Sequence, residues 1–344
     1  MGRFIGRKIL GVLLLAGMIA AGLTGCKKAD GPKDEYDCFI SMDDAKVEAE
    51  KKNLPILVTV TVEESERDGM EAGSKYYLEN ILGTKEFKDY ADNHFVLYRF
   101  DFSQKSYEKT VAPENASDKE KAEADKYAQY MKEGYMLASI LGVQYTPSIF
   151  ILTKEGYPVS EVEYFEDSLS ADGFIKILET YADKTQFLND MLSATKKGSN
   201  EEKLKAIEAL YSTTPDMWQI FLLDLAKQAI KLDPDNKSGE MGKYVLAVGE
   251  DEAANLYNEQ KFQEAAEKYI ELAQHKFMTP ELAQQCYYMA AWTLASTGSA
   301  APDVIMGYLN NAVSVAPDSE NTPLIYSFME YFQSLFVTSD AEAE

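Results

Sequence analysis

The sequence has few thiols and few imidazoles. Its 344 residues include three cysteines and two histidines, His94 and His275. Cysteine and histidine supply most zinc ligands in proteins, and small exported domains that depend on disulfides carry many cysteines. The scarcity excludes a disulfide framework and leaves too few soft ligands for a zinc site. We therefore expect no metal and no other cofactor.

Basic residues are scarce relative to acidic ones. Lysine and arginine number 34 against 57 aspartates and glutamates, which gives a formal net charge of −23. Proteins that bind nucleic acid through a general surface neutralise phosphates with Lys and Arg. An acidic surface repels phosphates and anionic lipid headgroups. We therefore expect no nucleic-acid partner.

Long apolar runs are few, and the one at the N-terminus has a recognisable context. Residues 9–25 are uncharged and follow Arg3, Arg7 and Lys8. The run is shorter than the roughly 20 residues that a membrane-spanning helix needs. A basic segment followed by a short apolar one is typical of a secretory signal. We expect residues 1–25 to be a signal peptide that is removed; an ordinary signal peptide with a chance cysteine and a retained anchor are the alternatives.

The end of this run carries a short motif. Leu23, Thr24 and Gly25, followed by Cys26, resemble the lipobox of bacterial lipoproteins, in which the cysteine receives a diacylglyceryl group and the chain is cleaved before it. The resemblance implies a lipid on Cys26, with acyl chains such as palmitate. It also implies that the mature chain is anchored to a membrane of the cell envelope, on the periplasmic side or the outer surface. Polar residues 26–37 are expected to form a tether.

Residues 38–184 alternate between strand and helix patterns. The stretch 56–62 is almost entirely β-branched or apolar, as in a strand that is buried on both faces. Further strands are expected at 95–101, 148–152 and 160–164, and helices at about 42–52, 76–93, 121–141 and 171–181. This order predicts an α/β domain with a central mixed sheet flanked by helices.

The order resembles the thioredoxin fold, and two phrases strengthen the resemblance. Residues 45–57 resemble the family's opening helix and first strand, with Pro55 between them. Residues 142–150 resemble the segment in which the family carries a cis proline facing the active site. The resemblance implies a cis bond before Pro147, with an ordinary trans proline at the start of an edge strand as the alternative. It further implies that Thr146 and Pro147 line a groove for an extended peptide.

The chemistry of that family needs Cys-x-x-Cys at the start of the helix that follows the first strand. The matching positions fall near Glu66 and Gly69, and neither is a cysteine. A carboxylate cannot attack a disulfide. The sequence thus predicts a thioredoxin-like domain without dithiol catalysis. Cys38 and Cys286 are expected to be small buried residues, with a thiol-disulfide oxidoreductase or thiol-dependent chaperone that uses Cys38 as the alternative.

The acidic residues between the first strand and the next helix could suggest a cation site. Glu63, Glu64, Glu66, Asp68 and Glu71 lack the alternating ligands and the fixed glycine of a calcium loop. We expect them to form a solvated loop.

Residues 185–344 show no strand pattern, and their apolar residues recur at intervals of three and four. The segments 225–236 and 309–319 resemble the second helix and Pro-containing turn of a tetratricopeptide repeat, and 253–269 resembles its first helix. The resemblance implies a tetratricopeptide-like α-helical array of stacked helix pairs. A generic helical bundle is the alternative.

No nucleophile elbow, phosphate-binding loop or zinc signature occurs after Cys26, which argues against an enzyme and leaves no catalytic residue to name. The sequence predicts a redox-inactive envelope lipoprotein that binds a protein or peptide or acts as a scaffold.

Overall fold

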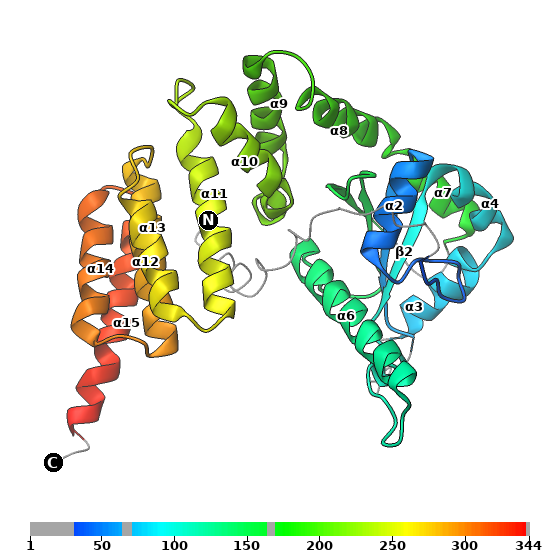
Figure 1. Cartoon of the computed structure of the whole chain (residues 1–344), viewed down its shortest axis with the longest axis horizontal. Helices are drawn as coiled ribbons and strands as arrows, with labels where there is room; N and C mark the ends of the chain where they lie inside the picture. The colour runs from blue at the N-terminus through cyan, green and yellow to red at the C-terminus, as the bar shows by residue number, and fades with distance from the viewer. Residues whose placement is uncertain (1–30, 64–70, 164–168, 342–344) are drawn as a thin grey trace. The chain divides into compact units, whose positions relative to one another are not determined.

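The computed structural model describes residues 31–63, 71–163 and 169–341, with side chains described as far as Ser334. The expected signal peptide, the lipobox with Cys26, and the positions Glu66 and Gly69 lie outside these residues. In the described part, the chain divides into two compact units: residues 31–198 with 208–222, and residues 199–207 with 223–341 (Figure 1). Among the described helices, none combines the length and apolarity needed to cross a membrane.

The first unit is built on a four-stranded mixed sheet in the order β2-β1-β3-β4. Its strands are β1 (Ile56–Thr61), β2 (Val96–Asp101), β3 (Ser148–Leu152) and β4 (Pro158–Val162). β1 pairs in parallel with β2 and antiparallel with β3, which pairs antiparallel with β4. All six residues of β1 are buried, as the apolar run predicts. The sheet is mixed, as the sequence predicts.

Helices cover both faces of this sheet (Figure 1). Val58 shares a register with Tyr98 and Phe150, and these side chains pack with α2 (Met42–Lys52) and α6 (Asp118–Leu141). Thr59 lies on the other face, where its hydroxyl is 3.4 Å from that of Tyr77. That face is covered by α3 (Ala72–Tyr77), α4 (Lys85–His94) and α7 (Ala171–Glu179).

The single helix predicted over 76–93 is wrong, because the chain forms three shorter segments there. α3 passes into a π-helix, Leu78–Leu82, which ends at Gly83. Thr84 then caps α4, since its hydroxyl accepts a hydrogen bond from the N–H of Phe87. A capping hydroxyl fixes a new helix start at a residue where apolar periodicity alone would continue the old helix.

The first unit takes in residues that the sequence assigns to the second domain. α8 (Ala182–Ala194) packs against β4, and the 3-10 helix Asp216–Leu222 packs against α6. Trp218 is 8% exposed, its ring lies 6.3 Å from that of Phe150, and its indole N–H donates to the carbonyl of Leu141 at 3.4 Å. The packing therefore does not divide at residues 184 and 185, because a distant aromatic side chain completes the sheet's core.

The N-terminal segment also joins this unit. The N–H of Phe39 donates to Leu97 O at 2.9 Å, and the N–H of Arg99 donates to Phe39 O at 3.0 Å, beside the outer strand β2. The N–H of Ile40 donates to Pro32 O at 3.2 Å. Residues 32–37, which the sequence places in the tether, are thus held against the domain.

The second unit is helical, as predicted. It contains part of α9 (Asn200–Thr213), then α10 (Leu223–Leu232), α11 (Met241–Asn258), α12 (Phe262–Ala273), α13 (Pro280–Thr297), α14 (Pro302–Val315) and α15 (Thr322–Ala341). From α10 onward each helix packs against the next. Buried alanines such as Ala266 and Ala290 allow close approach around Tyr269. The tetratricopeptide-like period stays a prediction.

Candidate functional site

A cis proline lies at one edge of the thioredoxin-like sheet. The Thr146–Pro147 bond is cis, which confirms the prediction. Pro147 directly precedes β3, whose first residue, Ser148, pairs with Val60 near the end of β1. A Cβ placed on Gly73 would lie 3.2 Å from Pro147 Cδ, so the first turn of α3 sits directly against the proline. The helix that follows the first strand therefore begins at the cis proline, as the resemblance implies.

We call Gly73, Tyr145, Thr146 and Pro147 the cis-proline edge. Pro147 is buried, Thr146 is half-buried, and Tyr145 is 63% exposed. The hydroxyl of Tyr145 donates to Glu161 Oε1 at 3.0 Å. No described residue forms a hydrogen bond with the backbone N–H or C=O of Thr146. The edge thus places an exposed aromatic side chain beside the cis peptide bond.

Sequence reasoning found Thr146 and Pro147 but missed Gly73. The available signal was a residue without a side chain just before an expected helix, where a larger residue would press against Pro147.

The two thiols of the described residues are not placed for chemistry. Cys38 is 1% exposed, and its thiol donates to Tyr36 O at 3.9 Å. Burial raises the pKa of Cys38 well above its ordinary value. Cys286 is buried within α13, and burial raises its pKa to about 12. A thiol attacks a disulfide as the thiolate, so neither residue is a ready nucleophile in the folded chain.

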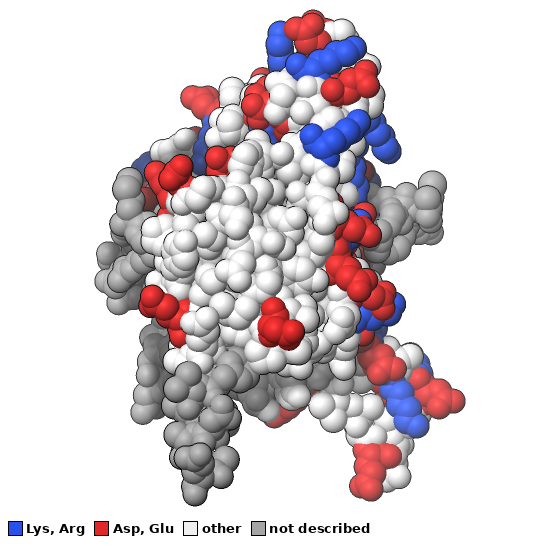
Figure 2. Space-filling view, turned by 90° about the vertical axis from the view of Figure 1, so that its left-hand side faces the viewer, with Lys and Arg blue, Asp and Glu red and all other residues white. Residues whose placement is uncertain are grey.

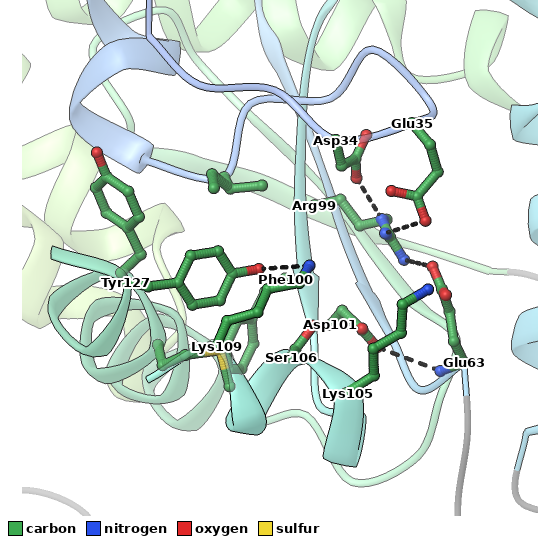
Figure 3. A pocket seen from close by; sticks show the side chains of 13 residues that line it. Asp34, Glu35, Glu63, Arg99, Phe100, Asp101, Lys105, Ser106, Lys109 and Tyr127 are labelled. Atoms are coloured by element: carbon green, nitrogen blue, oxygen red, sulfur yellow. Dashed lines mark hydrogen bonds and ion pairs between the residues drawn. The ribbon is translucent and has the colours of Figure 1, made fainter. Parts of the chain in front are cut away.

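A buried arginine organises the neighbouring strand end (Figure 3). Arg99, on β2, is 6% exposed. Its Nε donates to Asp34 Oδ2 at 2.5 Å, and its Nη1 donates to Glu63 Oε1 at 2.7 Å. Glu35 Oε1 lies 3.8 Å from Arg99 Nη2. Arg99 Nη1 also donates to Thr61 Oγ1 at 3.2 Å. We call Arg99 with Asp34, Glu35 and Glu63 the Arg99 cluster.

The charges of the Arg99 cluster depend on one another. Burial alone would lower the pKa of Arg99, but Asp34 and then Glu63 outweigh it and raise that pKa above its usual range. Burial raises the pKa of Glu63, although Arg99 acts in the opposite direction. The expectation of a solvated acidic loop is therefore wrong for Glu63, because this carboxylate is partly buried and paired with a cation.

Hydrogen bonds connect the Arg99 cluster to α3. The N–H of Val62 donates to Ser74 Oγ in α3 at 3.1 Å. The N–H of Glu63 donates to Asp101 Oδ1 at 3.2 Å, and Ser106 Oγ donates to Asp101 Oδ2 at 2.6 Å. Glu63, which follows Val62, is thus held by Arg99, and Gly73, which precedes Ser74, lies against Pro147. The cluster holds in place the strand end from which the cis-proline edge is built.

The hollow beside Arg99 is too small for an organic substrate. It has a volume of about 30 Å³ and is lined by acidic and basic side chains, including Asp101, Lys105 and Lys109 (Figure 3). Such a volume holds about one or two water molecules. Among the described residues, no group of three or more His, Cys, Asp or Glu side chains is arranged to hold a metal ion. The geometry is that of a structural ion-pair network.

Comparisons with known proteins agree with the two-part fold. Residues 42–182 match the thioredoxin-like domain family, and residues 241–334 match a family described as an uncharacterised protein C-terminal domain. An uncharacterized protein of Treponema pallidum (strain Nichols) is 27% identical over 116 residues, which are 34% of this chain and 38% of that protein. The chain thus spans less than two-fifths of the length of this curated relative.

A solved structure, described as DsbH oxidoreductase, shares 15% identity and aligns with a TM-score of 0.31, over 48% of this chain and 93% of its own. The chain contains a thioredoxin-like domain, with a mixed sheet flanked by helices, followed by a helical C-terminal region.

Proposed function

We propose that this chain is a membrane-anchored lipoprotein outside the cytoplasm whose thioredoxin-like domain binds an extended protein segment without thiol chemistry. The observation that carries the proposal is the cis-proline edge. There Tyr145 is exposed, and the backbone of Thr146 forms no hydrogen bond with any described residue. Extended peptides bind at such places through main-chain hydrogen bonds, while neighbouring side chains supply specificity.

The alternative is a thiol-disulfide oxidoreductase or thiol-dependent chaperone that uses Cys38. Such an activity requires a thiolate that can reach its substrate. Cys38 is buried, and its pKa is raised by that burial. These two properties favour binding over redox catalysis.

The anchoring part of the proposal rests on the sequence around Cys26. The lipobox resemblance supplies the lipid, and two or three acyl chains hold a protein on a membrane far better than one. The Arg99 cluster is relevant to this role, because Asp34 ties the segment that follows Cys26 to β2. In this proposal, the anchor and the binding edge are joined through one strand end.

Binding is tested with a library of random linear peptides displayed on phage and panned against the whole chain in detergent. Enriched peptides are then measured by fluorescence anisotropy. Tyr145→Ala, which removes an exposed side chain, and Thr146→Pro, which removes the backbone donor, are each expected to weaken binding by about tenfold or more. Tyr107→Ala is the matched control, since Tyr107 is also exposed in this unit.

Circular dichroism melts of all three variants separate lost binding from lost folding. Peptides that bind the Tyr145 and Thr146 variants as tightly as the unaltered chain would overturn the assignment of the cis-proline edge.

Anchoring is tested separately, by growing cells that express the chain with labelled palmitate. Label is expected on the unaltered chain and on Cys38→Ala, and is expected to be lost in Cys26→Ala. Label retained in Cys26→Ala would refute the lipid assignment and leave the peptide-binding proposal untouched.

A further inference from the structure

A second and larger cavity lies at the other end of the sheet from the cis-proline edge. It has a volume of about 530 Å³, within the range of roughly 300–1,000 Å³ that is usual for small-molecule sites. Pro55 and Phe95 line it and directly precede β1 and β2, and Ile151 lines it near the end of β3. The remaining walls come from α4, α7 and α8. We call it the α4–α8 cavity.

One part of this cavity is apolar and aromatic. Ile151 pairs with Leu57, so its side chain lies on the sheet face that α4 and α7 cover. Leu178 of α7 is buried beside it. On α4 the rings of Tyr90 and His94 are stacked, with centroids 4.1 Å apart and planes at 11°. The cavity therefore offers a flat wall and an apolar floor to an apolar group.

Two opposite charges line the same cavity. Lys154, in the turn after β3, donates a hydrogen bond to Asn53 Oδ1, which is uncharged. Glu179, at the end of α7, is exposed, and its charge, after burial, raises the pKa of Tyr90. Among the described residues, neither Lys154 nor Glu179 has an ion-pair partner. Both charges are thus available to a ligand that carries an anion and a cation.

Asn189 adds an unsatisfied polar atom. It lines the cavity from α8, and its Oδ1 is buried without a hydrogen-bond partner among the described residues. Buried polar atoms in native proteins are hydrogen-bonded in the great majority of cases. The missing partner is a donor, since an amide oxygen only accepts. This wall therefore indicates a ligand with an N–H or O–H group.

We propose that the α4–α8 cavity binds a small zwitterionic molecule with an apolar body, of the chemical class of a dipeptide of apolar residues. Its carboxylate pairs with Lys154 and its ammonium group with Glu179, and charge-assisted hydrogen bonds of this kind are stronger than neutral ones. Its amide N–H donates to Asn189, and its side chains cover the apolar floor. The site does not depend on the cis-proline edge.

Two other places fit such a molecule less well. The hollow beside Arg99, at about 30 Å³, is too small. α14 and α15 lie at the left of Figure 1 and face the viewer in Figure 2, where the surface is largely uncharged with isolated acidic residues. Residues 277–344 contain no lysine and no arginine, so this segment has no such cation for a carboxylate.

The test is equilibrium dialysis of the whole chain in lipid nanodiscs against tritium-labelled phenylalanyl-leucine. One molecule is expected to bind per chain, with a Kd below about 100 μM. Two blocked forms of the same dipeptide serve as matched probes. Acetylation removes the ammonium charge and amidation removes the carboxylate, and each is expected to weaken binding about tenfold or more.

Variants connect each charge of the dipeptide to one residue. Lys154→Met and Glu179→Gln are each expected to weaken binding about tenfold. The amidated dipeptide should bind Lys154→Met as it binds the unaltered chain, because both changes remove the same ion pair, and the acetylated form should do so with Glu179→Gln. Lys88→Met and Glu108→Gln, at sites outside the cavity with similar exposure, are the matched controls, with expected changes below twofold.

Asn189→Leu separates binding from folding. The variant removes the unsatisfied oxygen, so thermal melts should show an unchanged or raised Tm. Binding of the dipeptide should weaken about fivefold, because the amide N–H loses its acceptor. A lowered Tm with unchanged binding would show that Asn189 has a structural role and would remove it from the site.

Three results would overturn the proposal. The first is the absence of saturable binding up to about 1 mM dipeptide. The second is equal binding of the blocked and free dipeptides, or equal loss in Lys88→Met, which would show that the two charges are not recognised. The third is loss of binding in Tyr145→Ala with full binding in Lys154→Met, which would assign the dipeptide to the cis-proline edge.

Discussion

Replacing Arg99 with methionine should strongly destabilise the thioredoxin-like unit. Asp34 is 7% exposed at its side chain and would lose its main cationic partner, and Glu63 would lose its ion pair. Breaking a buried ion pair by removing one partner costs about 3–5 kcal/mol, because a buried charge is left uncompensated. Glu63 and Glu35 are partly open to water, which can solvate them after the change. We therefore expect a loss near the lower bound, about 3 kcal/mol.

The assay is urea unfolding followed by tryptophan fluorescence. The chain has two tryptophans, and Trp218 belongs to the first unit, so Trp292→Phe in every variant confines the signal to that unit. Adding Asp34→Asn to Arg99→Met removes the stranded charge and should restore about 1–2 kcal/mol. Lys85→Met is the matched control, because it breaks an exposed pair with Asp89. Its expected cost is at most about 0.5 kcal/mol.

A loss below about 1 kcal/mol for Arg99→Met, the value typical of exposed pairs, would refute the reasoning. It would mean that water reaches the Arg99 cluster freely and that the cluster does not hold the strand end.

Three further predictions concern stability. Burial raises the pKa of Glu63 in the folded chain above its ordinary value of 4.5, so between these two pKa values the folded chain binds a proton that the unfolded chain has lost, and the stability falls as the pH rises. Glu63→Gln should therefore flatten the pH dependence of the free energy of unfolding in this range. Urea melts at a series of pH values measure this dependence, and an unchanged slope contradicts the prediction. Trp218→Ala should cost about 3–5 kcal/mol in the first unit and speed its proteolysis; unchanged cleavage would separate residues 208–222 from that unit. Gly134→Ala would place a Cβ 2.2 Å from Phe100 Cδ2 and should cost about 1–3 kcal/mol in thermal melts, whereas Gly307→Ala, with open space around it, should be neutral or slightly stabilising; equal effects would contradict the packing.

The sequence predicts the first three strands of the sheet well, because a strand that is buried on both faces appears in the sequence as a continuous apolar run. The run from Ile56 to Val62 corresponds to β1, and the apolar stretches at 95–101 and 148–152 correspond to β2 and β3. Helix boundaries were less accessible where a single capping side chain decides them. Thr84 starts a new helix through one hydrogen bond, and no periodicity signals it.

The cis-proline edge could be predicted only in part. Thr146 and Pro147 follow from a resemblance that rests on contiguous residues. Gly73 required knowing which side of α3 meets the proline. The Arg99 cluster was missed altogether, because Arg99 and Asp34 lie 65 positions apart and a charged residue within a strand gives no local sign of its partner. The packing of the whole chain determines which distant residues form such ion pairs, so local sequence patterns do not predict them.

The docking of residues 32–37 sets how far the domain can stand from a membrane. If Cys26 carries the proposed lipid, only residues 27–31 lie between it and Pro32, whose carbonyl accepts a hydrogen bond from the N–H of Ile40. Fully stretched, this connection reaches about 20 Å. In the proposed function, a tether of that length keeps the cis-proline edge close to the bilayer. It thereby raises the effective concentration of the edge for protein segments that emerge beside the membrane. Targets farther out in the envelope would have to come to the membrane to be bound.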